Sequence, residues 1–312
     1  MPSSSQLRRS SDATWIIIAA SVIALFGACL VRKIAVGATS GLLVVSTNAM
    51  MIGGAALIRK RGWHNVADWL TATAQLGFLA AVLTTLSYVL ASTNMPLQDS
   101  SLISLDQAIG VDWRSLIDDF MRLPSLMVLL NYAYASLSYQ LALFLPVVFL
   151  TGHGRLGSQF VLAWSIALGA AVVISPFTPA LGGYLHFQLD PKDFPEVRIW
   201  AAWLFVTPVY ALRDGSLNVV ELRNLDGIIT FPSFHAAVAV LMAWAASGIP
   251  LLRYPMIFLN LLMLISTIPI GGHYLIDVMA GSLVAVASIV AARAWVSLPL
   301  PRIGLRPIRA EI

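Results

Sequence analysis

Three ionisable side chains stand inside the apolar segments of this 312-residue chain: His235, His273 and Asp277. The other charges fall at segment ends, in loops or in tails. An ionisable group within a membrane span is costly to bury, so it marks a functional site by default. Two imidazoles and a carboxylate are sufficient for acid–base and nucleophilic chemistry. These three residues therefore predict an enzyme.

The composition is that of an integral membrane protein. The chain is 58% hydrophobic and 11% charged, with a mean hydropathy of +0.82, whereas a soluble domain carries roughly a quarter charged residues. The formal net charge is +4, but the basic excess lies in short loops and tails. That distribution reports membrane topology and not nucleic-acid binding. The only cysteine, Cys29, excludes an intramolecular disulfide.

Eight apolar stretches predict about eight transmembrane helices, since a helix needs about 20 residues to cross a bilayer. Residues 199–212 are apolar but short, which predicts a re-entrant or interfacial helix. We expect an all-α integral membrane bundle, divided into a tail and two extra spans (1–68), a six-helix core (69–300) and a basic cytoplasmic tail (301–312). The predicted spans are 14–31, 35–58, 69–92, 124–151, 158–181, 231–249, 252–270 and 273–296.

The orientation follows from the basic residues of the short loops. Arg59, Lys60 and Arg61 place the second connection in the cytoplasm. The third connection (93–123) holds five Asp against two Arg, and the fifth (182–230) six acids against four bases, so both face outward. The Arg32-Lys33 pair lies on the predicted outer side. It disagrees with the rest, and suggests that the first two spans are drawn wrongly.

The third connection has a pattern of its own. Ser104-x-x-Gln107 matches a capping box. Apolar residues then recur at helical spacing, which predicts an amphipathic helix on the outer membrane interface. Such a helix either covers the bundle or takes part in substrate binding, and the pattern fits both. The residues at this spacing are Trp113, Leu116, Ile117, Phe120 and Met121.

The segment from Thr230 to His235 is typical of a helix start. Pro232 is predicted at the first helical position, where proline gives up no needed donor. The amides of Ser233, Phe234 and His235 then lack intrahelical acceptors. Free N–H groups at a helix N-terminus suit a phosphate.

The second histidine is predicted to repeat this arrangement. Gly271-Gly272 permits a tight turn, and His273 is expected to open the last span, sharing a helix face with Asp277 about 6 Å along the axis. The 38 residues from His235 to His273 hold one descending and one returning helix. Both histidines are therefore expected at the outer membrane face.

At these residues the chain resembles the type-2 phosphatidic acid phosphatase superfamily, the membrane relatives of vanadium haloperoxidases. That family reads Pro-Ser-Gly-His, then Ser-Arg, five residues, His, three residues, Asp. The chain has Pro-Ser-Phe-His at 232–235, then Ser266-Thr267, with His273 and Asp277 at the family's spacing. The phenylalanine at 234 and the sequence of 272–277 look more like the inositolphosphorylceramide synthase branch, which transfers a phospho-head group between lipids.

The resemblance implies a mechanism and a substrate class. His273 attacks phosphorus and forms a phosphohistidine, Asp277 fixes the imidazole tautomer, and His235 protonates the leaving oxygen and then activates the acceptor. Water as acceptor gives a lipid phosphatase, and an alcohol gives a phosphotransferase. The expected partner is a lipid phosphate taken from the bilayer, with no metal or other cofactor and no nucleic acid. We expect a multi-pass protein of the bacterial inner membrane with an outward-facing site.

Two departures from the family concern the phosphate-binding cations. Thr267 replaces an arginine, and the family's first motif, Lys, six residues, Arg-Pro, is absent. Some cation must neutralise the phosphate. We expect Arg213 and Arg223, on the stretch just before Pro232, to bind it together with Ser233 and Gly272.

Two other classes of function are compatible with buried histidines. A polytopic transporter would use the His/Asp set as a protonatable site, although such sites lie near the bilayer midplane between repeats, and no repeat is visible. A metal centre with His, His and Asp ligands conflicts with the positive ends of the two predicted helices.

Overall fold

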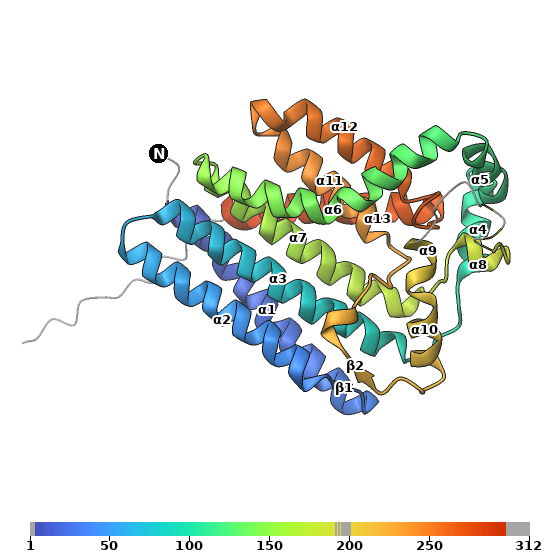
Figure 1. The fold of residues 1–312 in the computed structure, drawn as a ribbon, viewed down its shortest axis with the longest axis horizontal. Coiled ribbons are helices and arrows are strands. Elements are labelled where there is room, and N and C mark those ends of the chain that lie inside the picture. Colours follow the sequence, from blue (N-terminus) through green and yellow to red (C-terminus); the bar gives the residue numbers. More distant parts are fainter. Residues whose placement is uncertain (1–3, 191, 193, 195–200, 298–312) are drawn as a thin grey trace, which may run out of the picture.

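The computed structural model describes residues 4–190, 192, 194 and 201–297. Over these residues the chain is a bundle of helices with one minimal two-stranded sheet (Figure 1). The basic tail predicted at 301–312 lies outside the described residues. The eight main helices are α1 Ser4–Arg32, α2 Ala38–Lys60, α3 His64–Ala91, α6 Pro124–Leu150, α7 Gly154–Ile174, α11 Phe234–Ser247, α12 Pro250–Ser266 and α13 Leu275–Ser297.

These helices confirm the predicted all-α membrane bundle. Each predicted span overlaps one of them, and six are long and apolar enough to cross a membrane. The exceptions are α11 and α12, with 14 and 17 residues. Both are shortened at the end that carries the histidines, because residues 231–233 and 267–271 form turns there and 272–274 are irregular.

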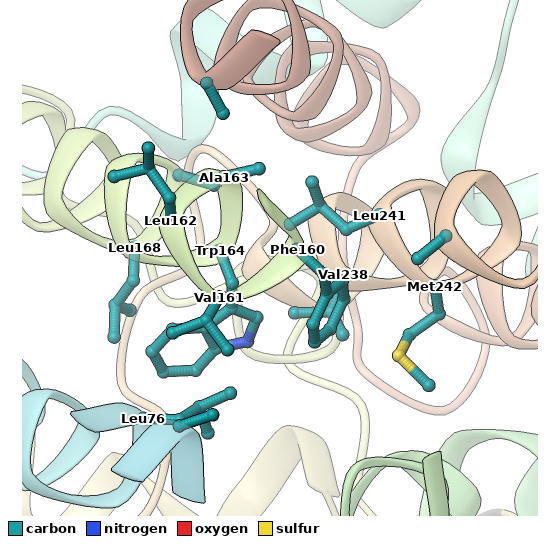
Figure 2. Close-up of a cluster of buried hydrophobic side chains, with 14 of the residues drawn as sticks. Leu76, Phe160, Val161, Leu162, Ala163, Trp164, Leu168, Val238, Leu241 and Met242 are labelled. Atoms are coloured by element: carbon teal, nitrogen blue, oxygen red, sulfur yellow. The ribbon is translucent and has the colours of Figure 1, made fainter. Parts of the chain in front are cut away.

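Helix α7 lies at the centre of the bundle and packs against α1, α3, α11 and α13. In Figure 1 it runs between α6 and α3. Its side chains Phe160, Trp164 and Leu168 meet Leu76 of α3 and residues of α11 (Figure 2). Because lipid tails are as apolar as these side chains, close van der Waals packing holds the helices together.

The first two helices form where they were predicted, and the position of Arg32 at the predicted outer end is explained by its hydrogen bonds. Its guanidinium donates to the hydroxyl and the carbonyl of Ser92, at the end of α3. Strand β1 (Ala35–Val36) pairs in parallel with β2 (Val219–Val220) of the fifth connection. The Arg32-Lys33 pair therefore lies at the same end of the bundle as that connection, with the charge of Arg32 held by protein oxygens.

The third connection forms two helices instead of one, α4 (Asp99–Ala108) and α5 (Trp113–Met121). The predicted capping box is wrong, because Ser104 and Gln107 lie inside α4, where the Ser104 hydroxyl bonds to the Ser100 carbonyl. The N-cap of α5 is Asp112, whose carboxylate accepts from Ser115 N at 2.8 Å. The helical spacing of the apolar residues is confirmed by α5, which buries Trp113 and Ile117.

The fifth connection is built from short elements. The interfacial segment predicted at 199–212 is two helices over its described part, α9 (Ala201–Leu204) and α10 (Val206–Arg213). Helix α8 (Gly183–His186) precedes them, and the 3-10 turns are Ser175–Phe177 and Leu222–Asn224. Figure 1 shows α4, α5, α8, α9 and α10 gathered at one end of the bundle. We call the helices α4, α5 and α8 the cap.

Candidate active site

The first histidine follows a helix start that is capped locally. Ser233 is the N-cap of α11, and its Oγ accepts from Ala236 N at 3.3 Å. Pro232 therefore precedes the N-cap residue, so the prediction that it occupies the first helical position is wrong. The Ser233 amide donates to the carbonyl of Asp277 at 3.0 Å. The amides of Phe234 and His235 have no acceptor among the described residues, so this N-terminus is open to an anion.

The second histidine lies before its helix, not within it. Helix α13 begins at Leu275, because residues 272–274 are irregular and Gly272 has a φ of +72°, outside the helical region. The predicted shared helix face is replaced by a helix-capping contact. The Asp277 carboxylate accepts from Tyr274 N at 3.0 Å, and the same oxygen lies 3.3 Å from His273 Nδ1.

The start of α13 is closed by a residue of the cap. The two oxygens of Asp106 accept from Leu275 N at 2.9 Å and from Ile276 N at 2.8 Å. The prediction that both helix N-termini are free for phosphate is therefore wrong at α13. Burial raises the pKa of Asp106 above its ordinary value, and these two hydrogen bonds partly oppose that effect.

Further contacts from the cap hold the loop that carries His273. The His273 carbonyl accepts from the Trp113 indole at 2.9 Å, and its amide donates to the Thr267 carbonyl at 3.2 Å. The Tyr274 hydroxyl donates to Asp99 at 2.9 Å. The backbone of His273 is thus held at both polar groups. With Nδ1 facing Asp277, its Nε2 is the nitrogen left to react.

The three predicted catalytic residues come together where α11 and α13 cross. A Cβ added at Gly281 of α13 would lie 2.1 Å from the Ser233 carbonyl oxygen, so only glycine permits this approach. Asp277 is fully buried, His273 is 6% exposed and His235 is half-buried. The second oxygen of Asp277, Oδ1, has no hydrogen-bond partner among the described residues.

Tyr134 of α6 joins the two histidines, and the sequence did not single it out. Its ring stacks on His235 with the centroids 4.2 Å apart, and its hydroxyl lies 3.5 Å from His235 Nδ1. On the other side, an added Cβ at Gly271 would lie 3.1 Å from Tyr134 and 2.9 Å from the His273 ring. In the sequence, Tyr134 is one of several polar residues of that span, which fit either a lipid groove or interhelical hydrogen bonding.

Interhelical bonding does describe other polar residues of α6. Asn260 of α12 donates to Gln140 at 2.7 Å in the buried interface, and Gln140 also bonds to Ser136. Tyr132 and Tyr139 point out of the described bundle and are exposed.

The expected phosphate-binding residues are dispersed. Ser233 and Gly272 lie at the site, but the amide of Gly272 donates to Ile268 and its carbonyl accepts from Gly183. Arg213 ends α10, where its guanidinium donates to the Met95 carbonyl at 2.9 Å. It lines a cavity together with Thr230 and Phe231, the residues that lead into Pro232.

Arg223 is exposed on a 3-10 turn. The same connection holds two other basic residues that are weaker candidates for the cation: Lys192 is exposed, and Arg198 lies outside the described residues. Thr267, at the family's arginine position, is buried with its hydroxyl bonded to the Leu264 carbonyl. Over the described ranges, no group of three or more His, Cys, Asp or Glu side chains is arranged to hold a metal ion.

The fold and the site define a class: a multi-pass membrane protein with a His/His/Asp cluster at one end of its helical core. A model of the PAP2 superfamily matches residues 100–291. The chain belongs to this superfamily of phosphatases and phosphotransferases, and it is an enzyme of that general kind. No curated protein and no solved structure matches the chain.

Proposed function

We propose that this protein transfers phosphoryl or phospho-head groups of membrane lipids through a phosphohistidine at His273. The observation that carries the proposal is the contact between His273 Nδ1 and Asp277, which leaves Nε2 as the nucleophile. A carboxylate on one imidazole nitrogen selects the tautomer whose other nitrogen carries the lone pair.

The reaction proceeds in two balanced steps. His273 Nε2 attacks phosphorus, the bond from phosphorus to the ester oxygen breaks, and His235 gives its proton to that oxygen. His235 then takes a proton from the acceptor hydroxyl, whose oxygen attacks phosphorus and releases His273. The stacking on Tyr134 holds the His235 ring during both transfers.

The phosphate is proposed to bind at the start of α11. The free amides of Phe234 and His235 point to that end of the helix, where the dipole favours an anion. The Ser233 oxygen accepts from Ala236 N, so its own proton is available for a phosphate oxygen. Arg213 and Arg223 remain the proposed cations, since both precede Pro232 on the same connection. Gly272 contributes the turn before His273.

The substrate is proposed to be a lipid, and the site to face away from the cytoplasm. The motif at 232–235 and 272–277 resembles the inositolphosphorylceramide synthase branch, which favours transfer to an alcohol. The acidic connections and the cap lie at the same end of the bundle as the histidines, and the Arg59–Arg61 loop lies at the other end (Figure 1). By the positive-inside rule, the basic loop is cytoplasmic, which supports an outward-facing site. A bacterial inner membrane would place that site in the periplasm.

The function is tested on purified protein in detergent or nanodiscs. Release of phosphate or of the head group is measured on a panel of lipid phosphates and phospho-head-group lipids, with and without alcohol acceptors. We expect turnover that survives excess EDTA and that orthovanadate inhibits in the absence of chelator. Loss of activity in EDTA, restored by zinc or magnesium, together with indifference to vanadate, would favour a metal centre.

The orientation is tested separately. A cysteine replacing Asp214, in a Cys29→Ala background, should react with an impermeant thiol reagent on intact spheroplasts. A cysteine replacing Lys60 is the matched control and should react only after lysis. The reverse pattern would place the site in the cytoplasm.

A further inference from the structure

The start of α13 lacks an N-cap side chain from its own segment. Tyr274 occupies the N-cap position, and its aromatic side chain cannot accept a hydrogen bond as Ser, Thr, Asp or Asn would. Asp277, at the third helical position, accepts from the Tyr274 amide, which is half of a capping box. The amides of Leu275 and Ile276 remain without a partner from their own segment.

The carboxylate of Asp106, from a distant part of the chain, accepts the hydrogen bonds that an N-cap side chain would accept. It lies 169 residues before Leu275, on α4, and gives one oxygen to each of the two amides. Its exposed fraction is 0%. Burying an ionised carboxylate costs several kcal/mol unless its oxygens are satisfied, and the two bonds satisfy them. A serine at 274 would cap the helix without a buried charge, so the long-range arrangement does more than begin a helix.

The first turn of α13 determines where Asp277 stands. One oxygen of Asp277 is shared between Tyr274 N and His273 Nδ1. If the turn loosens, that oxygen moves away from the imidazole, and the His273 ring loses the partner that orients it. The rest of the His273 loop is held by Trp113 and, through Tyr274, by Asp99. Among these residues of α4 and α5, Asp106 is the one that is hydrogen-bonded to the first turn of α13, the helix that carries Asp277.

We propose that Asp106 is a positioning residue for His273: it fixes the first turn of α13, so that Asp277 holds the imidazole with Nε2 directed at phosphorus. This inference rests on the proposed function, because it takes His273 as the nucleophile. It assigns to α4 a part in catalysis beyond covering the bundle.

The test compares four full-length variants in nanodiscs with the native protein: Asp106→Asn, Asp106→Ala, Asp112→Asn and His273→Ala. Asn keeps the size of Asp106 and one acceptor oxygen, whereas Ala keeps none. Asp112 is the matched control, since it is also a helix-capping aspartate, but its carboxylate accepts from Ser115 N of α5 and not from α13. The kcat and KM per folded protein are measured on phosphatidic acid and on nitrophenyl phosphate, with folding checked by monodispersity and thermal melting.

A positioning role predicts a fall in kcat for Asp106→Asn of about 10- to 100-fold, because a misplaced reactive group costs rates of that order. The KM should stay within about threefold, since the phosphate binds at α11. The fall should be equal on both substrates, because nucleophile placement does not depend on the leaving group. The kcat of Asp106→Ala should fall further than that of Asp106→Asn. The kcat of Asp112→Asn should stay within about twofold of that of the native protein.

A merely structural role would lower the yield and the melting temperature, while the folded fraction keeps its kcat. A native-like kcat in folded Asp106→Asn, with His273→Ala inactive, would overturn this inference and leave the proposed function intact. An active His273→Ala would overturn both. If Asp106→Ala does not fold, Asp106→Asn alone decides.

Discussion

The two histidines lie beside helix starts that are built in opposite ways: His235 just inside α11, and His273 just before α13. Helix α11 is capped by its own N-cap residue, Ser233, and the amides of Phe234 and His235 are left free. Helix α13 is capped by Asp106 of the distant helix α4, which accepts from the amides of Leu275 and Ile276. One N-terminus is therefore open to an anion, whereas the other is closed by one.

Under the proposed function, this difference assigns phosphate binding to the start of α11 and nucleophilic attack to the residue before α13. A phosphate at α13 would compete with the Asp106 carboxylate for the same amides and would be repelled by its charge. At α11 no protein carboxylate is hydrogen-bonded to the first turn in the described structure. The open end is suited to hold the phosphate, and the closed end to hold a nucleophile still. Four predictions test this division, from the largest expected effect to the smallest.

Removal of the nucleophile should have the largest effect. We expect His273→Ala to lower kcat by at least about 10³-fold, because loss of a covalent nucleophile leaves only binding and electrostatic stabilisation. The variant should still fold, since alanine is compatible with the buried loop. Turnover close to that of the native protein, in a well-expressed sample, would remove His273 from its role.

Removal of the proposed general acid should depend on the leaving group. His235→Ala should lower kcat on a lipid substrate by roughly 10²- to 10⁴-fold, the usual contribution of a positioned acid or base. The first step with nitrophenyl phosphate should suffer far less, because nitrophenolate departs without a proton. The burst of nitrophenolate measures that step alone. Equal losses on both substrates would exclude His235 as the acid.

The contact between the two helix starts should be intolerant of a methyl group. In Gly281→Ala the new Cβ would lie 2.1 Å from the Ser233 carbonyl oxygen, so the two helices must move apart. We expect about 1–3 kcal/mol of destabilisation, as for other overpacked sites, and a kcat lowered by about 100-fold.

Gly169→Ala is the matched control for this variant. Gly169 also lies within a long helix, α7, but nothing stands within 4 Å of its added Cβ. Its melting temperature and kcat should stay at or above those of the native protein, since alanine favours helix. If both variants behave alike, the close approach of α11 and α13 is not needed for turnover.

A phosphate-binding cation should give the smallest effect. Arg213→Ala should lower kcat/KM by about 10- to 100-fold, which corresponds to a charge-assisted hydrogen bond of roughly 1.5–3 kcal/mol. Arg213→Lys should recover part of the loss if the contact is bidentate. Arg223→Ala is measured beside it. Unchanged kinetics for Arg213 together with a loss for Arg223 would move the cation to the exposed turn.

The helices and the positions of the His/His/Asp motif were predictable because their signals are local. The apolar stretches give the spans by length alone, and the spacing of His235, His273 and Asp277 identifies the family's motif. The start of α13 was predicted two residues too early, at His273 instead of Leu275. His273 fits a helical continuation by spacing, and only the turn at Gly272 places it outside.

The contacts of the cap could not be predicted, because they depend on tertiary packing. Asp99 and Asp106 were counted as outer-loop charges that report orientation, yet both are buried against distant backbone amides. A single sequence does not distinguish a solvated aspartate from one that caps a helix 169 residues away. Tyr134 was missed for the same reason, since its partner His235 lies on another helix.

The most direct test of the division between the two helix starts is the site of covalent phosphate. His235→Ala is mixed with nitrophenyl phosphate and quenched in alkali, and its histidine peptides are analysed by mass spectrometry and by comparison with phosphohistidine isomers. Because Nδ1 faces Asp277, we expect phosphate on Nε2 of His273, and none when His273→Ala is treated alike. Phosphate on Nδ1 of His273, or on a different residue, would contradict the account.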